Sequence, residues 1–314
     1  MKQRNTEAKL KNYCHPEALA RLPEYLSTIM KLLIIGPQSF ENLALVEAAK
    51  KRGHFVLRAS LHEISLMVTN NKMEAINNGK KLEKFDICLF RGISPFLAKA
   101  KTLARYLDFT GVKVVDQELC NKAYEFDKMF TFFGFFQKGL PCIDTIQFST
   151  FEELSRNSVK IPEPMVIKDI CGMHSRGICS FETKKELMNF FRTRQDSVQQ
   201  FLIQKKVNAD CYYRVLVVSG RALGAMKRVS FFHPRKNKIP LAERSEKTEL
   251  TVELKELAVR AAAAVNADIA GVDIIFDNKK PKLLEANRSP KFKRFTKIMG
   301  VNVADKIISY LEKL

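Results

Sequence analysis

Apolar and polar positions alternate in two rhythms along the chain from residue 30 onward. Short apolar runs suited to buried strands are separated by longer stretches with the three-to-four-residue spacing of helices. In the first part of the chain, this succession of strand, helix and strand is typical of a parallel sheet with crossover helices. The pattern there predicts strands at residues 31–36, 55–57, 86–90 and 112–115, and helices at residues 41–52 and 97–107.

A hairpin is also predicted in this region, because strand-like runs at residues 64–69 and 72–76 flank Asn70 and Asn71. Asparagine tolerates the positive φ angles that tight turns need.

The remaining chain continues the same two rhythms. Residues 1–29 carry no strand signal and are expected to form an extension, and the first domain is expected to close near residue 119. Farther on, the pattern predicts strands at residues 143–148, 165–168, 178–181, 201–204, 212–218, 222–229, 269–276 and 282–286, and helices at residues 124–138, 184–192, 250–266 and 303–314, with another starting at Phe151.

Composition excludes several classes of protein. The 314 residues are 46% apolar and 28% charged, which is inconsistent with disorder caused by low hydrophobicity. No apolar run approaches the ~20 residues of a membrane helix, and the first residues lack the apolar block of a secretory signal. The seven cysteines are irregularly spaced without a CxxC pair, so neither a zinc site nor a disulfide framework is predicted, and a reducing cytoplasm is expected.

Charge is the strongest feature of the composition. Lysine and arginine number 53 against 34 acidic residues, for a formal net charge of +19. Such a charge favours polyanionic partners, namely nucleotide, nucleic acid, acidic peptide or anionic lipid. The excess is concentrated in residues 221–238 and 279–314. For most of these side chains, a solvated basic surface is the simpler interpretation.

The last predicted hairpin carries the most informative polar residues. Asp273 lies within an apolar strand, where a carboxylate is costly unless it has a cationic or donor partner. Glu285 and Asn287 are two residues apart on the return strand, so their side chains share a face. Converging carboxylate and amide oxygens suit a hard divalent cation such as Mg²⁺. A structural ion pair, for example with Arg288, explains the pattern equally well.

Lys168 closes an apolar strand beside a loop that contains Gly172 and Gly177. Glycine lets the backbone approach a phosphate closely, and its N–H groups can line an anion-binding nest. The loop has no Walker A sequence. By itself Lys168 fits a surface lysine as well as a phosphate ligand, and Lys128 indicates still less.

Together these features resemble the ATP-grasp superfamily, and specifically the RimK-like amino-acid ligases. The resemblance covers residues 30–314, and the motifs occur in the same order as in the family. The complete set of motifs in this order is more specific for the family than any single motif. The segments that carry it are Asp127-Lys128, Val166-Ile167-Lys168, GMHSRGI at residues 172–178, RVLVV at 214–218, AMKRVS at 225–230, AGVDII at 270–275 and LEANRSP at 284–290.

The resemblance implies an ATP-grasp fold of mixed α/β and α+β type. A Rossmann-like pre-ATP-grasp domain would occupy residues 30–119, a central lobe residues 120–206, and a C-terminal lobe with the metal site residues 207–314. The two lobes would clamp ATP together with Mg²⁺, with a pair of ions expected and Mn²⁺ as a substitute.

The same resemblance implies roles for individual residues. Lys168, Arg228 and Arg288 would serve catalysis by facing the transferred phosphoryl group or the substrate carboxylate. The Mg²⁺ ligands would be Asp273, Glu285 and Asn287. The nucleotide would be bound by Lys128, Lys168, the loop from Gly172 to Gly177, the adenine-facing segment with Gln204, Lys205 and Val207, and Asp210 near the ribose.

Two departures from the family pattern concern the substrate. Family members often have Ser-Pro-Gly-Phe-Lys-Gly after the metal-binding Asn, whereas this chain has Lys291 and Arg294 at the two glycine positions. Basic side chains there remove backbone freedom and add charge beside the site. The phosphate loop also carries Met173, His174 and Arg176 where smaller residues are common.

The implied reaction converts a carboxylate into an acyl phosphate, which an amine then attacks. Such chemistry needs positioning and charge neutralisation rather than a protein nucleophile. The expected partners are ATP, an amino acid such as glutamate and an acidic small-molecule or protein acceptor, without a membrane, and similar ligases form homo-oligomers. Two alternatives stay open: a nucleotide-binding regulator without turnover, and a basic protein that binds RNA or the ribosome.

Overall fold

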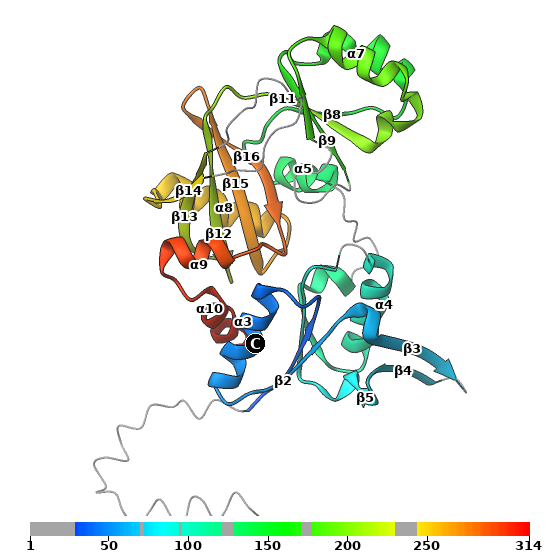
Figure 1. Ribbon diagram of the computed structural model, residues 1–314, viewed down its shortest axis with the longest axis vertical. Helices are drawn as coiled ribbons and strands as arrows, with labels where there is room; N and C mark the ends of the chain where they lie inside the picture. Colours follow the sequence, from blue (N-terminus) through cyan, green and yellow to red (C-terminus); the bar gives the residue numbers. More distant parts are fainter. Residues whose placement is uncertain (1–28, 70–71, 94–95, 121–127, 171–177, 230–243) are drawn as a thin grey trace, which may run out of the picture.

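The computed structural model describes residues 29–69, 72–93, 96–120, 128–170, 178–229 and 244–314 (Figure 1). Its N-terminal domain is built on a parallel sheet with the strand order β2-β1-β6-β7. Helices α3 and α4 cover opposite faces, so four of the five residues of β1 are buried. The predicted elements are confirmed with small shifts of their ends: β1 (Lys31–Ile35), α3 (Phe40–Lys51), β2 (Phe55–Ala59), β6 (Ile87–Phe90), α4 (Leu97–Phe109) and β7 (Lys113–Val115).

A small antiparallel sheet projects from this domain (Figure 1). The two predicted hairpin strands are confirmed as antiparallel partners, while the predicted turn at Asn70 and Asn71 lies outside the described residues. The sheet consists of β3 (Ile64–Thr69), β4 (Lys72–Asn77) and β5 (Lys80–Lys81).

The middle of the chain forms a second lobe around an antiparallel sheet with the order β10-β9-β11-β8. Helices α6 and α7 pack on it through a core that includes Phe181, Leu187 and Phe191. Its elements are β8 (Thr145–Gln147), α6 (Phe151–Arg156), β9 (Met165–Asp169), β10 (Ile178–Phe181), α7 (Lys184–Arg192) and β11 (Phe201–Lys205).

The C-terminal lobe contains a five-stranded antiparallel sheet with the order β14-β13-β12-β15-β16. Helix α8 and the buried side of α5 cover one face, and α9 and α10 cover part of the other. Its elements are α5 (Lys128–Gln137), β12 (Cys211–Val218), β13 (Arg221–Val229), β14 (Arg244–Thr248), α8 (Val252–Ala264), β15 (Ile269–Asp277), β16 (Lys280–Asn287), α9 (Lys293–Met299) and α10 (Val303–Leu311).

Four features of this lobe differ from the sequence-based expectation. Strand β14 and helix α9 were not predicted, because β14 is polar without an apolar period and α9 is only seven residues long. Helix α8 is shorter than predicted at both ends, and α10 ends at Leu311. On α5, Phe132 and Phe135 are buried, whereas Phe136 is exposed. The boundaries between domains remain predictions.

Short 3₁₀ helices occupy Leu61–Glu63, Leu82–Lys84, Gln117–Cys120, Ser158–Lys160 and Gln195–Gln200.

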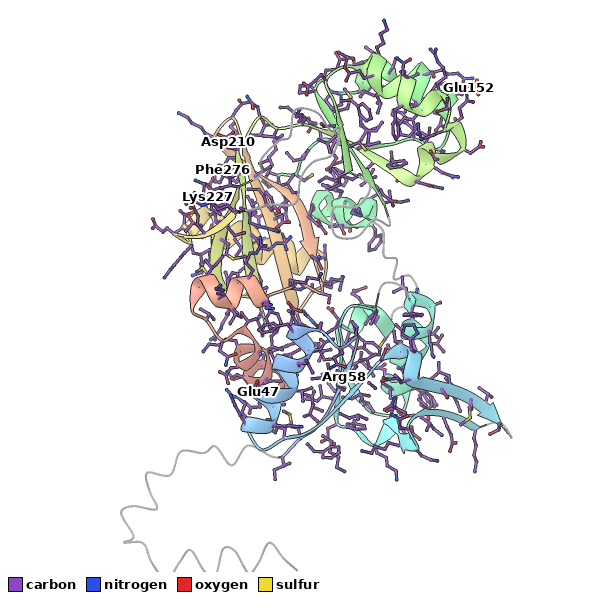
Figure 2. The ribbon with its side chains drawn as sticks, viewed as in Figure 1. Glu47, Arg58, Glu152, Asp210, Lys227 and Phe276 are labelled. Carbon is purple, nitrogen blue, oxygen red and sulfur yellow. The ribbon has the colours of Figure 1, made fainter. Side chains whose placement is uncertain are left out.

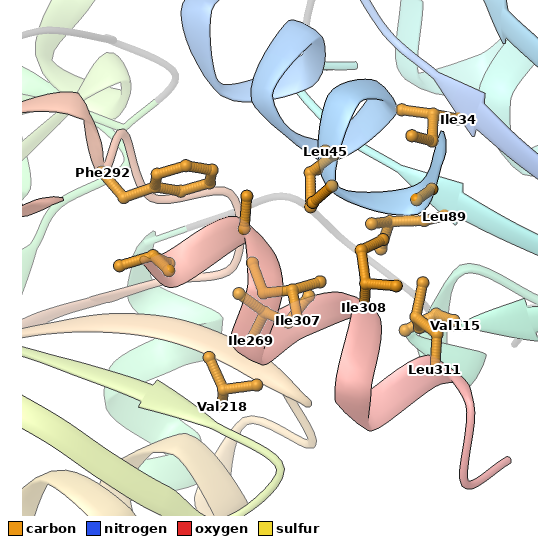
Figure 3. Packing of buried hydrophobic residues seen from close by; sticks show 14 of the residues in the cluster. Ile34, Leu45, Leu89, Val115, Val218, Ile269, Phe292, Ile307, Ile308 and Leu311 are labelled. Atoms are coloured by element: carbon orange, nitrogen blue, oxygen red, sulfur yellow. The ribbon is translucent and has the colours of Figure 1, made fainter. Parts of the chain in front are cut away.

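One hydrophobic cluster joins the N-terminal domain to the C-terminal lobe (Figure 3). Leu45 of α3 and Ile308 of α10 belong to it, together with Val218 of the C-terminal sheet. Ion pairs reinforce the contact, because Arg52 binds Asp305 of α10 and Glu312, the residue that follows this helix. The C-terminal sheet is thereby anchored to the parallel sheet. Within the described residues, no helix has the length and apolar character needed to span a bilayer.

Candidate active site

The two faces of the C-terminal sheet differ in chemistry. Along β12, Val215 and Val217 lie in the core beneath α8, whereas Leu216 and Val218 lie in the cluster with α10. Because side chains alternate along a strand, Tyr212 and Arg214 share a face with Leu216. That face is therefore apolar next to α9 and α10 and polar toward the other end of β12.

The predicted metal ligands lie together on this polar half. Asp273 of β15 pairs directly with Glu285 of β16, and Asn287 pairs with Gly271, two residues before Asp273. All three oxygen-bearing side chains consequently occupy one face of the sheet, and period-two spacing had predicted this for Glu285 and Asn287. Their role as metal ligands remains a proposal.

Asp273 is held by an arginine that sequence reasoning did not single out. Arg214 lies directly opposite Asp273 in the sheet, and its Nε and Nη2 donate to the two carboxylate oxygens at 2.6 and 2.5 Å. Burial disfavours the charged form of Arg214, but the carboxylate of Asp273 outweighs this and raises the pKa of Arg214. Asp273 is therefore part of a structural ion pair, as one interpretation of the sequence predicted, but the cation is Arg214 rather than Arg288.

Lys168 reaches the same site from the middle lobe. Burial lowers the pKa of this half-buried amine, while the nearby carboxylates of Glu285 and Asp273 act to raise it. Lys128 is also close enough to lower the pKa of Lys168, and its Nζ donates to the carbonyl oxygen of Asp169 at 2.7 Å. Two lysines and two carboxylates from different lobes therefore share one electrostatic environment.

The predicted adenine-facing segment forms the end of β11 and the chain that follows it. Gln204 is buried, and its Nε2 donates to Thr145 Oγ1 at 2.8 Å. Lys205 Nζ contacts Asp277 Oδ2 at 2.9 Å, which connects the middle lobe to the end of β15. Val207 is half-buried, and Asp210 is exposed at the end of the sheet nearest the middle lobe (Figure 2).

The two predicted catalytic arginines lie in different surroundings. Arg228 pairs with Tyr212 across β13 and β12, and its guanidinium carbon is 5.2 Å from the centre of the tyrosine ring. Burial and the neighbouring Arg214 lower the pKa of Arg228. Arg288 instead contacts Asp116 Oδ1 at 3.2 Å, at the boundary with the N-terminal domain. Arg228 is thus brought to the polar half of the sheet, whereas Arg288 is engaged at the domain contact.

The phosphate loop with Gly172 and Gly177 lies outside the described residues. In the part of the chain that is described, no three side chains of His, Cys, Asp or Glu converge as a metal site. Asp273, Glu285 and Asn287 offer two carboxylates and one amide, an oxygen-only donor set that fits Mg²⁺.

Comparisons with known proteins identify the family of the chain. Residues 147–311, just over half of the chain, match the RimK-like ATP-grasp domain family. A probable alpha-L-glutamate ligase of Trichodesmium erythraeum is 27% identical over 90% of this chain and 96% of its own. Its counterpart in Picosynechococcus is 28% identical with the same coverage.

Solved structures of ATP-grasp ligases share the fold. D-cycloserine synthetase DcsG has a TM-score of 0.69 at 12% identity, covering 90% of this chain and 99% of its own. The ligase PsnB, solved with a phosphomimetic precursor variant, Mg and ADP, has a TM-score of 0.67 at 17% identity, covering 89% and 97%.

Proposed function

The chain belongs to the RimK-like ATP-grasp family of ATP-dependent ligases that form C–N bonds, and we propose that it joins an acceptor carboxylate to the amine of an amino acid through an acyl phosphate. Glutamate is the proposed amino acid, because the curated relatives are named as probable alpha-L-glutamate ligases. An acidic small molecule or protein is the proposed acceptor, because the chain carries a net charge of +19.

The observation that carries this proposal is the shared environment of Lys168, Asp273 and Glu285. The carboxylates of Glu285 and Asp273 in one lobe act on the pKa of a lysine in the other, and Arg228 lies on the same sheet as these carboxylates. Cationic side chains beside an oxygen-only donor set are the groups needed to bind a magnesium–triphosphate.

The proposed chemistry has two displacement steps. A carboxylate oxygen of the acceptor attacks the γ-phosphorus of ATP, the bond to the bridging oxygen breaks, and ADP leaves. The amine nitrogen of the amino acid then attacks the acyl carbon, inorganic phosphate leaves with the electrons of the C–O bond, and the nitrogen loses a proton. Lys168 and Arg228 would offset the negative charge that develops on the phosphoryl oxygens.

The metal-binding residues would be Asp273, Glu285 and Asn287. When bound, Mg²⁺ supplies charge neutralisation at the phosphate oxygens. Arg214 would hold the Asp273 carboxylate in a fixed orientation through its two hydrogen bonds. A bidentate arginine restricts both oxygens at once, which favours a rigid ligand geometry.

The test is an ADP-release screen over amino acids and carboxylate acceptors, with mass spectrometry of the products. The single variants Asp273→Asn and Glu285→Gln should both fold, and each should abolish Mg²⁺-dependent ADP formation. Glu152→Gln, a surface position on the middle lobe far from the site (Figure 2), should leave it unchanged. Full turnover in either site variant would contradict the proposal.

Binding measurements alongside the screen separate the alternatives. Wild-type protein that binds ATP but releases no ADP with any acceptor would indicate a regulator. Nucleic-acid binding that weakens steeply with salt, without ligase products, would indicate an RNA-binding protein instead.

A further inference from the structure

The N-terminal domain contacts the segment that immediately follows Asn287. The backbone N–H of Gly92 donates to Ser289 Oγ at 3.0 Å, and Arg91 Nη2 donates to the carbonyl oxygen of Pro290 at 2.7 Å. The buried carboxylate of Glu41, in the first turn of α3, accepts from the backbone N–H of Lys293 at 3.2 Å. Three separate groups of the N-terminal domain thus bind three residues of the segment 289–293.

A further hydrogen bond connects this domain contact to Asn287, the candidate metal ligand. The backbone N–H of Ser289 donates to Asn287 Oδ1 at 2.9 Å. A backbone N–H can only donate, so the side-chain atom that faces it must be the amide oxygen, not the nitrogen. An amide oxygen has two lone pairs, so this bond fixes the orientation of Asn287 and leaves one lone pair for a cation.

Arg91 is unusual for a residue that merely stabilises a contact. It is buried, and its Nε and Nη1 have no hydrogen-bond partner among the described residues. Burial lowers the pKa of Arg91 to about 10, against the opposing influence of Glu41 and Asp116. Burying a guanidinium with unsatisfied nitrogens is costly. Its Nη2 donates to Pro290, and its guanidinium carbon lies 5.7 Å from the centre of the Phe292 ring. These contacts therefore indicate that Arg91 positions the segment after Asn287.

We propose that the N-terminal domain sets the metal-binding orientation of Asn287 through Ser289, with Gly92 and Arg91 as the groups that hold Ser289 and Pro290 in place. Ser289 and Arg91 are positioning residues, and the proposal rests on the function proposed above. It makes the N-terminal domain part of the metal site although it supplies none of the metal ligands.

The test measures ADP binding by calorimetry across a Mg²⁺ titration, so that no catalytic turnover is needed. Ser289→Ala removes the acceptor for Gly92 and should raise the half-saturating Mg²⁺ concentration at least fivefold. Ser289→Thr keeps a hydroxyl and should restore most of the wild-type value. Metal-free ADP affinity should be the same in all variants, because Asn287 is not proposed to contact the nucleotide directly.

A matched control comes from the other contact between the same two domains. Ser309 on α10 also accepts a hydrogen bond from the N-terminal domain, from Arg52 Nη2 at 2.5 Å. Ser309→Ala should lower the melting temperature about as much as Ser289→Ala does. It should not change the Mg²⁺ dependence of ADP binding. Arg91→Lys and Arg52→Lys repeat this comparison independently. Arg91→Lys should change the Mg²⁺ dependence of ADP binding, and Arg52→Lys should not.

Each outcome is decisive. An unchanged Mg²⁺ dependence in Ser289→Ala would overturn the positioning role while leaving the ligase proposal intact. An equal shift in Ser309→Ala would also overturn it, because the effect would then be general destabilisation. Wild-type ADP binding that is independent of Mg²⁺ would overturn both proposals.

Discussion

Arg214 lies directly across the sheet from Asp273 and binds both oxygens of its carboxylate. The two side chains come from strands β12 and β15, which are 59 residues apart in the sequence at this point. The pair occupies the polar half of the sheet beside Glu285 and within electrostatic reach of Lys168. It therefore connects the stability of the lobe to the geometry of the candidate site.

Replacing Arg214 with lysine should destabilise the fold as well as the site. Lysine has a single ammonium group and cannot hold two carboxylate oxygens in a planar fork. We expect Arg214→Lys to lower the free energy of unfolding by about 1.5–3 kcal/mol, the range for hydrogen bonds to charged groups. Denaturant unfolding measures this, with Arg221→Lys at the exposed start of β13 as the control. Equal stability of both variants would contradict the structural role of the pair.

Removing the charge of Lys168 should weaken nucleotide binding. We expect Lys168→Met to lower ATP affinity at least tenfold, or about 1.5–3 kcal/mol, because a charge-assisted contact to phosphate is lost. The matched control is Lys113→Met, an exposed lysine on β7 in the N-terminal domain. Calorimetric titration with ATP gives both affinities, and the assignment of Lys168 to the phosphates is wrong if they agree.

The domain contact should become less stable as pH rises through the acid range. Burial raises the pKa of Asp116 to about 6, despite the opposing charge of Arg288. The folded state thus binds a proton more tightly than the unfolded state, whose aspartate has a pKa of about 3.9. This contribution to stability is full below about pH 4 and is lost as pH rises through about 6.

Asp116→Asn tests that pH dependence. The amide does not titrate, so the stability of the variant relative to wild type should improve by about 2–3 kcal/mol between pH 4 and pH 7. Unfolding curves at several pH values supply the comparison. A constant difference across this range would show that Asp116 titrates normally in the folded protein.

A methyl group at Gly271 should disturb the segment that follows Asn287. A Cβ atom at this position would lie 2.7 Å from Cβ of Pro290, whose carbonyl oxygen is held by Arg91. Because a proline ring cannot rotate away, Gly271→Ala should cost about 1–3 kcal/mol of stability through overpacking. It should also raise the Mg²⁺ concentration needed for ADP binding. Wild-type values for both quantities would mean that the segment is free to move.

The shared face of two candidate metal ligands could be predicted from the sequence because local periodicity contains the needed information. Glu285 and Asn287 are separated by two residues on one strand, so their common face follows from strand geometry alone. The acid in the apolar strand around Asp273 signalled a required partner. Strand β14 escaped detection because it is a polar edge strand, and its paired charges, such as Glu246 with Lys227, carry no apolar period.

The partner of Asp273 could not be identified in the same way. Arg288 was the natural candidate because it is close in sequence, but it turns toward Asp116 of the N-terminal domain. Arg214 becomes the partner only because β12 lies between β13 and β15 in the sheet. Nothing in the pattern of a single strand specifies which other strand will be its neighbour.

The amino-acid sequence by itself determined the elements, their apolar faces and the order of the family motifs, since each depends on residues close together along the chain. The tertiary structure alone decided that Arg214 binds Asp273, that Lys168 lies within electrostatic reach of the carboxylates of another lobe, and that Gly92 donates a hydrogen bond to Ser289 beside Asn287. These contacts depend on strand order and domain packing, which arise when distant segments bury their apolar surfaces together.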